Sequence, residues 1–231
     1  MNLPFDSAAG RNYESEEFEA FQSLGKLLKA LGCAEETLRP LLGNSLRLTL
    51  IDTQTVEAGQ IQWEPFFTDH PDIADRYYGT WQNQGFVPAS TKPDYLRDNI
   101  HYFYNPAAFN VAVWHGETLC GVACGGYKGE QERGFVSVML REANPMPTQP
   151  LRGKIGLVVH EAAAVYAREL GVGRVCYIGP FSEGAEKVHK AMGFRKENIE
   201  FRPGWHTEAY VGYVTEDKQR SILAERPELR P

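Results

Sequence analysis

A run of strand, loop, helix and strand between residues 135 and 179 constrains the fold of this chain more than any other feature. Residues 135–142, FVSVMLRE, and residues 174–179, RVCYIG, are rich in the β-branched and apolar side chains typical of strands. Between them lie a proline-rich loop, residues 143–150, and a helical apolar pattern, residues 155–170. A crossover of this length predicts that the two strands are parallel neighbours in one sheet.

The remaining pattern extends this unit on both sides. Residues 109–115 and 118–129 read as two strands, and the HGET turn between them predicts a hairpin. After the crossover we expect a helix over residues 182–193, closed by Gly193, and a strand over residues 209–214.

The first half of the chain is less regular. We expect a strand at residues 61–67, IQWEPFF, followed by helices over residues 70–85 and 92–104. Before them, residues 15–32 predict a helix capped by Ser15 and ended by Gly32, and residues 45–52 predict a strand.

This order predicts a mixed α/β fold, in which helices flank a central mixed sheet. We divide the chain into an N-terminal helical extension (residues 1–59), a main domain (60–215) and a polar C-terminal tail (216–231). Two roles are open for the extension. It packs on the main domain, or it is a docking arm for a protein partner or for self-association.

Composition and charge exclude several classes of protein. The 231 residues are 42% apolar and 23% charged, as in an ordinary globular domain. No apolar run approaches the roughly 20 residues that span a bilayer, and the N-terminal sequence lacks the basic and apolar regions of a secretion signal. The net charge of −6 argues against bulk attraction to nucleic acid or anionic lipid. We expect a cytoplasmic protein without a nucleic-acid or membrane partner.

The four cysteines, Cys33, Cys120, Cys124 and Cys176, predict no metal site, because no His or Cys lies near them at ligand spacing. Cys120 and Cys124 are four residues apart in a predicted strand, so we expect both on the same face of the sheet. Buried thiols in a reducing compartment are the expected state.

The start of the crossover helix has features of an anion site. Arg152, Gly153, Lys154, Ile155 and Gly156 form a basic, glycine-containing loop directly before the helix. The first amides of a helix have no intrahelical partner and lie at the positive end of its dipole. Glycines would let a phosphate approach these amides, and the two cations would add charge.

In this order of elements, residues 61–214 resemble the GCN5-related N-acetyltransferase (GNAT) family, whose members bind acetyl-CoA. The resemblance is strongest over residues 133–195, where RGKIGLVVHEAAAVYARELGVGRVCYIG looks like the family's pyrophosphate loop, helix and following strand. SEGAEKVHKAMGFRK looks like the next segment, in which a helix ends in Gly-Phe before a new strand. The resemblance implies acetyl-CoA as acyl donor and an amine as acceptor.

The chain departs from the family pattern at three positions. Counted from Arg152, Gly156 is fifth where the family has glycine fourth, so the loop is one residue short or its register differs. Ser182 stands where the family often has an Asn that contacts the cofactor. His189 stands where many members have a Tyr that protonates the departing thiolate, a reaction that imidazole can also perform.

The resemblance also implies roles for the end of the strand at residues 135–142. A backbone amide there, at Leu140, would contact the thioester carbonyl, and Glu142 is the best candidate for the base that deprotonates the amine. A solvated charge at the strand end is the other interpretation of Glu142. His160 and Glu161 fall on the polar side of the crossover helix and are expected to face solvent.

Three functions remain open from the sequence. The first is an acyl-CoA-dependent N-acyltransferase. The second is a catalytically degenerate GNAT-fold protein with a structural, assembly or binding role, since fold does not guarantee activity. The third is a small-molecule or nucleotide binder that uses the helix N-terminus.

Overall fold

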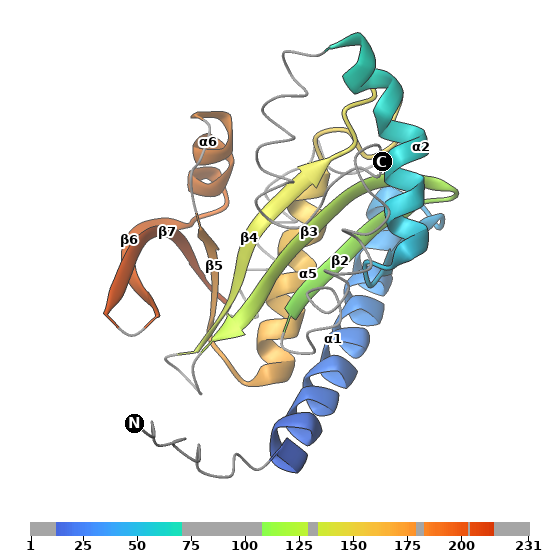
Figure 1. Ribbon diagram of the computed structural model, residues 1–231. Coiled ribbons are helices and arrows are strands. Elements are labelled where there is room, and N and C mark those ends of the chain that lie inside the picture. Colours follow the sequence, from blue (N-terminus) through green and yellow to red (C-terminus); the bar gives the residue numbers. More distant parts are fainter. Residues whose placement is uncertain (1–12, 71–107, 129–133, 179–182, 203, 215–231) are drawn as a thin grey trace, which may run out of the picture.

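The computed structural model describes residues 13–70, 108–128, 134–178, 183–202 and 204–214 (Figure 1). These residues form a seven-stranded sheet in the order β1-β2-β3-β4-β5-β7-β6. The strands are β1 (Leu46–Thr49), β2 (Ala108–His115), β3 (Thr118–Lys128), β4 (Phe135–Ala143), β5 (Arg174–Ile178), β6 (Arg195–Arg202) and β7 (Trp205–Tyr213). The helices described are α1 (Tyr13–Leu42), α2 (Thr53–Asp69), α5 (Ile155–Leu170) and α6 (Glu183–Ala191).

The sheet is mixed, as predicted. β4 and β5 are parallel, and every other neighbouring pair is antiparallel. The expected HGET hairpin joins β2 to β3, with His115 paired to Thr118. α5 ends as expected at Gly171, whose φ of 78° is a left-handed cap conformation that glycine adopts without strain.

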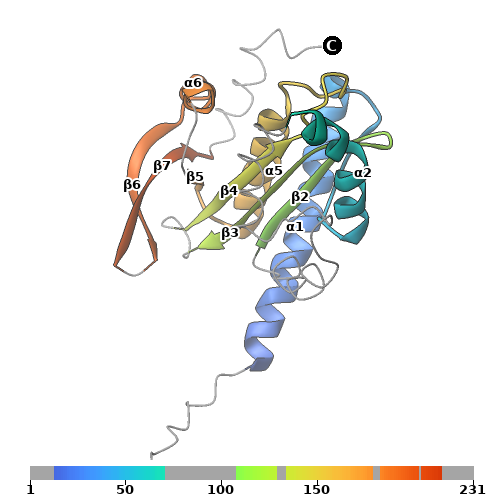
Figure 2. The same cartoon turned by 45° about the horizontal axis from the view of Figure 1, so that its top comes forward.

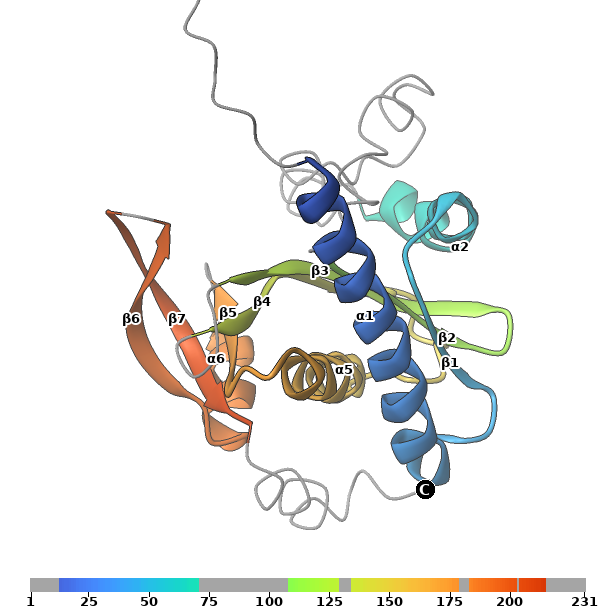
Figure 3. The same cartoon turned by 90° about the horizontal axis from the view of Figure 1, so that it is seen from below.

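Helices cover both faces of the sheet (Figure 3). α5 packs on one face and α1 packs against α5, so that their apolar side chains share one large core with that face. His189, Met192 and Phe194, at or just after α6, are buried beside this core. α2 covers the opposite face through a separate cluster around Trp63 and Phe67. We call these the α5 face and the α2 face.

α1 is longer than the sequence predicts. Gly32 does not end it, and the helix continues to Leu42. The reason is a continuous buried stripe on both sides of the glycine: Leu27, Ala30, Leu31, Ala34 and Leu38 are all at most 2% exposed. This spacing of three and four residues is that of one helix face, and its burial outweighs the poor helix propensity of one glycine.

The N-terminal segment therefore packs on the rest of the chain. α1 lies against α5, and β1 pairs with β2 at the edge of the sheet. The first turns of α1 extend past the sheet (Figure 2), and Leu28 on this helix is 50% exposed. A docking or self-association role for this segment stays a prediction.

The prediction of a strand at residues 61–67 is wrong, because these residues lie in α2. Asp52 caps this helix: its carboxylate accepts the amide of Thr55 at 2.8 Å. Trp63 and Phe67, four residues apart, are buried on one side of the helix, while Ile61 is 76% exposed. The four-residue spacing of the buried aromatics is helical, although Pro65 and the local β-propensity favour an extended reading.

The prediction that Cys120 and Cys124 share a face is also wrong. The register between β2 and β3 shifts by one residue between Val113 and Trp114, which makes Cys120 an extra residue on β3. Such a β-bulge reverses the alternation of side chains beyond it. Cys120 consequently lies in the α5-face core, and Cys124 packs against the α2-face cluster.

Some predicted elements lie outside the described residues. The two helices expected over residues 70–85 and 92–104 lie within residues 71–107, which are not described; only His70, the first residue of the first helix, is described. The C-terminal tail lies within residues 215–231, which are also not described. β6 was indicated only by the family resemblance. Among the helices that are described, none combines the length and the apolar character required to cross a membrane.

Candidate functional site

Strands β4 and β5 separate part-way along β4 (Figure 1). Their parallel pairing ends at Val138 and Tyr177, whereas β4 stays paired to β3 as far as Ala143. An extra residue, Met139, shifts the register with β3 at this point and is 39% exposed. From Met139 to Ala143, the edge of β4 that faces β5 has no strand partner among the described residues. We call this region the β4–β5 divergence.

α5 begins next to the divergence. Lys154 is its N-cap residue but makes no side-chain cap, and the first turn holds no acidic residue. Within the described part of the chain, the amides of Arg152, Gly153, Ile155 and Gly156 donate no backbone hydrogen bond. This end of α5 therefore presents the free amides and the positive dipole end that favour an anion.

The two glycines of the loop have different roles. Gly153 has a φ of +76°, which favours glycine, and a Cβ built on it would meet no atom within 4 Å. A Cβ on Gly156 would lie 3.0 Å from Nη1 of Arg141 on β4. The space above Gly156 is therefore taken up by a guanidinium group, and the loop is open only around Gly153.

Glu142 lies on the α2 face of the divergence. It pairs with Val122, which belongs to the α2-face cluster, and its charge contributes to raising the pKa of Cys124 on the same face. Burial raises the pKa of Glu142 itself to about 7, although the neighbouring Arg141 charge acts in the opposite direction. A carboxyl group with this pKa is half-ionised near neutrality, which suits a general base.

Arg141, one residue before Glu142, points to the α5 face. There it joins four buried side chains, and we call the five residues together the polar cluster: Arg141, His160, Tyr177, His189 and Tyr210. The guanidinium carbon of Arg141 lies 5.7 Å from the ring centre of Tyr177. The His189 ring stacks on Tyr210 at 5.3 Å and lies 4.4 Å from Tyr177.

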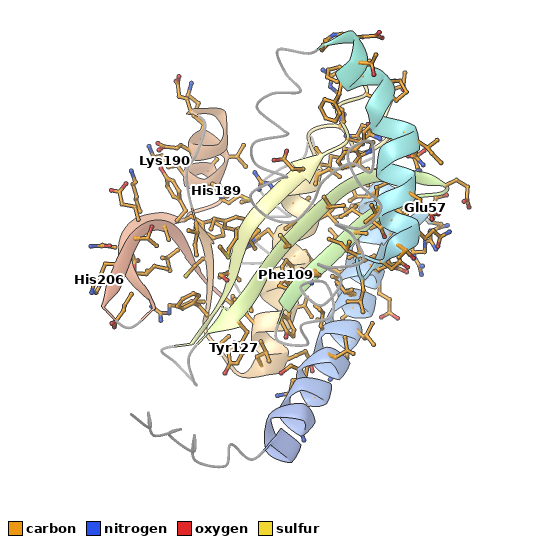
Figure 4. All side chains as sticks on the ribbon, in the orientation of Figure 1. Glu57, Phe109, Tyr127, His189, Lys190 and His206 are labelled. Carbon is orange, nitrogen blue, oxygen red and sulfur yellow. The ribbon has the colours of Figure 1, made fainter. Side chains whose placement is uncertain are left out.

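The polar cluster keeps its histidines uncharged. Burial, with the added charge of Arg141, lowers the pKa of both His160 and His189 to about 4. His189 is only 1% exposed, and Figure 4 shows it on the inner side of α6, whereas its neighbour Lys190 points outward. An imidazole in this setting is neutral throughout the physiological range.

Most of the predicted site residues lie near the divergence, but they are divided between the two faces of the sheet. The loop residues 152–156 and His189 lie on the α5 face, and Glu142 lies on the α2 face. Leu140 belongs to β4 within the divergence. Ser182 lies outside the described residues.

His160 and Glu161 do not face solvent, which corrects the sequence-based expectation. They are 6% and 5% exposed, because α5 is enclosed by the sheet and by α1. His160 and Tyr177 were not recognised as site residues in the sequence. The one available signal was spacing: His160 is four residues after Gly156, and therefore on the same side of α5.

Sequence comparisons identify no relative. No model of a known protein family matches the chain. No curated protein shows significant similarity to it.

Solved structures do share its architecture. An uncharacterized protein from Bacillus halodurans (bh2621) superposes with a TM-score of 0.51 at 12% identity, over 78% of this chain and 91% of the other. A GNAT-family acetyltransferase from Staphylococcus aureus Mu50 reaches 0.45 at 11% identity, over 74% and 100%. The PaiA N-acetyltransferase from Thermoplasma acidophilum, solved with coenzyme A, reaches 0.45 at 10% identity, over 73% and 99%.

GNAT acetyltransferases are thus among the structural neighbours of this chain, as the sequence resemblance predicted. The likeness to the Bacillus protein concerns the fold alone at 12% identity. The acetyltransferase matches have TM-scores below 0.5 and carry no inference about activity.

Proposed function

We propose that the protein is an acyl-CoA-dependent N-acyltransferase that transfers an acetyl group from acetyl-CoA to an amine. The observation that carries this proposal is the β4–β5 divergence, which has an uncapped helix N-terminus beside one face and a carboxyl group with a pKa of about 7 on the other. A donor held on the α5 face and an amine on the α2 face would meet where the two strands no longer pair.

The α5 face offers groups that fit coenzyme A. The free amides of Arg152, Gly153, Ile155 and Gly156, together with the cationic side chains of Arg152 and Lys154, would hold its pyrophosphate. Backbone groups at Leu140, on the unpaired edge of β4, would bind amide or thioester groups of the pantetheine arm. When bound, acetyl-CoA would supply an acyl group activated as a thioester. Ser182 stays a further proposed contact.

Glu142 would act on the acceptor. The transfer forms a C–N bond and breaks a C–S bond, so the amine loses a proton and the thiolate gains one. Glu142 would accept the amine proton, because its carboxylate is partly ionised at neutral pH and lies on the α2 face.

His189 would pass a proton to the thiolate as a relay, because a neutral imidazole must take up a proton at one ring nitrogen when it gives one up at the other. Its pKa of about 4 excludes an imidazolium donor at neutral pH. The phenol of Tyr210, whose ring stacks on His189 at 5.3 Å, would be the source of that proton.

This protonation pattern predicts the pH dependence of turnover. Expressed per unprotonated amine, kcat/KM should rise with pH through a limb near 7, as Glu142 becomes ionised, and should show no further limb between pH 5 and 8 from His189. The measurement is amine-dependent release of free thiol from acetyl-CoA between pH 5 and 9, with a panel of primary amines. Thiol release that does not depend on an amine at any pH would contradict the proposal.

The alternative is a catalytically degenerate GNAT-fold protein that binds or assembles without turnover. The observation that favours it is the burial of His189, at 1% exposure and in its uncharged form. Coenzyme A binding without amine-dependent thiol release would select this alternative.

A further inference from the structure

The middle of α1 has a side that the described chain leaves uncovered. Gly25, Leu28 and Gly32 are all exposed there, and Leu28, although apolar, is 50% exposed. A Cβ built on either glycine would meet no other part of the structure within 4 Å. The intervals of three and four residues place the three positions on one side of the helix. We call this side the glycine face.

A single copy of the chain gives no structural reason for these glycines. Both lie inside α1, and neither has the positive φ that Gly43 has just after the helix. Glycine is the poorest helix former after proline, so alanine would suit an exposed helical position better. Glycine is useful on a helix surface where a second helix comes close, because the distance between two helix axes depends on the side chains at the contact. The glycine face is therefore typical of a helix–helix contact.

The sequence continues the glycine face toward the N-terminus. Phe21 and Phe18 precede Gly25 at intervals of four and three residues, the spacing of a helix that packs along another helix. α1 is helical from Tyr13, and its first turns extend past the sheet (Figure 2). Among the α1 side chains that the structure describes, Leu27 is the first buried one. This pattern predicts that a second helix packs along the glycine face.

We propose that the glycine face of α1 packs antiparallel on the same face of a second copy of the chain, which gives a symmetric dimer. The charges of the helix favour this partner and this direction. Residues 13–19 include four glutamates, whereas residues 25–32 include Lys26 and Lys29 and no acidic residue. An antiparallel pair centred near residue 23 places the acidic segment of each copy along the basic segment of the other. A parallel pair would align like charges.

Side-chain sizes match in the same register. Phe21 of one copy lies opposite Gly25 of the other, and Phe18 lies opposite Leu28, so a large side chain faces the open space above a glycine. Twofold symmetry makes each of these contacts twice. Lys29 pairs with Glu169 at 2.9 Å but stays 64% exposed, so its charge remains accessible to the second copy.

The first test measures the oligomeric state of wild type, Leu28→Glu and Ile61→Glu by analytical ultracentrifugation. The concentrations extend to the high micromolar range, because a contact of one helix per copy is small. Wild type should be a dimer in equilibrium with the monomer. Leu28→Glu should raise the dissociation constant by about tenfold or more, since the contact would bury two unpaired charges. Ile61→Glu is the matched control and should associate as wild type does, because Ile61 is also apolar and exposed but lies on α2.

Two results would overturn the inference: a wild-type protein that is monomeric over the whole range, or equal dissociation constants for wild type and Leu28→Glu. Leu28 belongs to none of the described core clusters, so Leu28→Glu should melt in dilute solution at the wild-type temperature.

Gly25→Ala separates a lost contact from a lost fold. In dilute solution this variant should melt above wild type, because alanine is the better helix former at an exposed position. Its dimer should nevertheless dissociate more readily, because the new methyl group takes the space opposite Phe21. A higher melting temperature with unchanged association would contradict the proposed packing.

Disulfide cross-linking tests the direction of the pair. Gln22 and Glu36 are both exposed on α1, and their separation of two heptads gives them the same position in the pattern. Around a centre near residue 23, two copies of Gln22→Cys meet, whereas two copies of Glu36→Cys are about 40 Å apart at a rise of about 1.5 Å per residue. An interchain disulfide is expected for Gln22→Cys and not for Glu36→Cys, with wild type as the background from its native cysteines. Equal cross-linking of the two variants would overturn the antiparallel pairing.

Discussion

Glu142→Gln should lower kcat/KM for acetyl transfer by about 10²–10⁴-fold, the usual contribution of a positioned general base. The amide of glutamine has nearly the size of the carboxyl group but cannot accept the amine proton. The pH limb near 7 should disappear with it, because Glu142 is the group whose raised pKa accounts for that limb. Steady-state thiol release across the pH range measures both effects.

The control for this variant is Glu117→Gln. Glu117 lies in the β2–β3 turn, is exposed, and contacts Gln62 only through its backbone carbonyl. It should keep full activity. Wild-type activity in Glu142→Gln, with an unchanged pH profile, would remove Glu142 from the mechanism.

Stability gives an independent check on the same carboxyl group. The pKa of Glu142 in the folded protein, about 7, lies above the ordinary value of 4.5, so the folded state binds this proton more tightly than the unfolded state. The free energy of unfolding should therefore fall as pH rises from about 4.5 to 7. Glu142→Gln should flatten that part of the stability profile, because glutamine does not ionise.

Trp63→Ala should lower the free energy of unfolding by about 3–5 kcal/mol, the range for deleting a large buried aromatic side chain. Trp63 is 2% exposed and fills the cluster between α2 and the sheet. Its indole also donates a hydrogen bond to the carbonyl of Leu119 on β3 at 3.1 Å. The variant loses both the packing and this link between α2 and the sheet, and urea unfolding measures the loss.

Ile61→Ala is the control on the same helix. Ile61 is 76% exposed, so its truncation should change the free energy of unfolding by less than about 0.5 kcal/mol. Equal effects at the two positions would show that α2 is not packed on the sheet through its Trp63 side.

Much of the fold follows from local patterns. Apolar strands, a proline-rich loop and a helix ended by Gly171 predicted the β4–α5–β5 crossover correctly, because each signal acts within a few residues. β6 carries no such signal. It is an edge strand rich in charged residues, and among its side chains at residues 195–200, which the structure describes, Ile199 alone belongs to a buried cluster. Edge strands are polar where solvent replaces a neighbouring strand.

The two β-bulges, at Cys120 and Met139, could not be predicted from the sequence. An extra residue at Cys120 or Met139 depends on how two strands align, and no local pattern reports that register. Yet the bulge at Met139 helps to set the site. It lies where β4 leaves β5, just before Arg141 and Glu142 turn to opposite faces.

Sequence analysis could propose the part of the candidate site whose residues are adjacent in the chain. The loop before α5 was recognised because its glycines and cations are adjacent in sequence. His160 and Tyr177 of the polar cluster were missed because the cluster is assembled from separate elements: Arg141 comes from β4, His160 from α5 and Tyr177 from β5. A polar residue on a helix is normally expected to face water, and only the packing of α1 over α5 shows that His160 is buried.

The acyl donor is proposed to bind at the α5 N-terminus and the β4–β5 divergence. The most direct test is an amide NMR titration of the ¹⁵N-labelled protein with acetyl-CoA. We expect saturable shifts concentrated at residues 152–156 and 139–142, with little change in β1 or in the first turns of α1. No saturable shift at millimolar acetyl-CoA, or shifts centred on α1 or β6, would contradict this binding site.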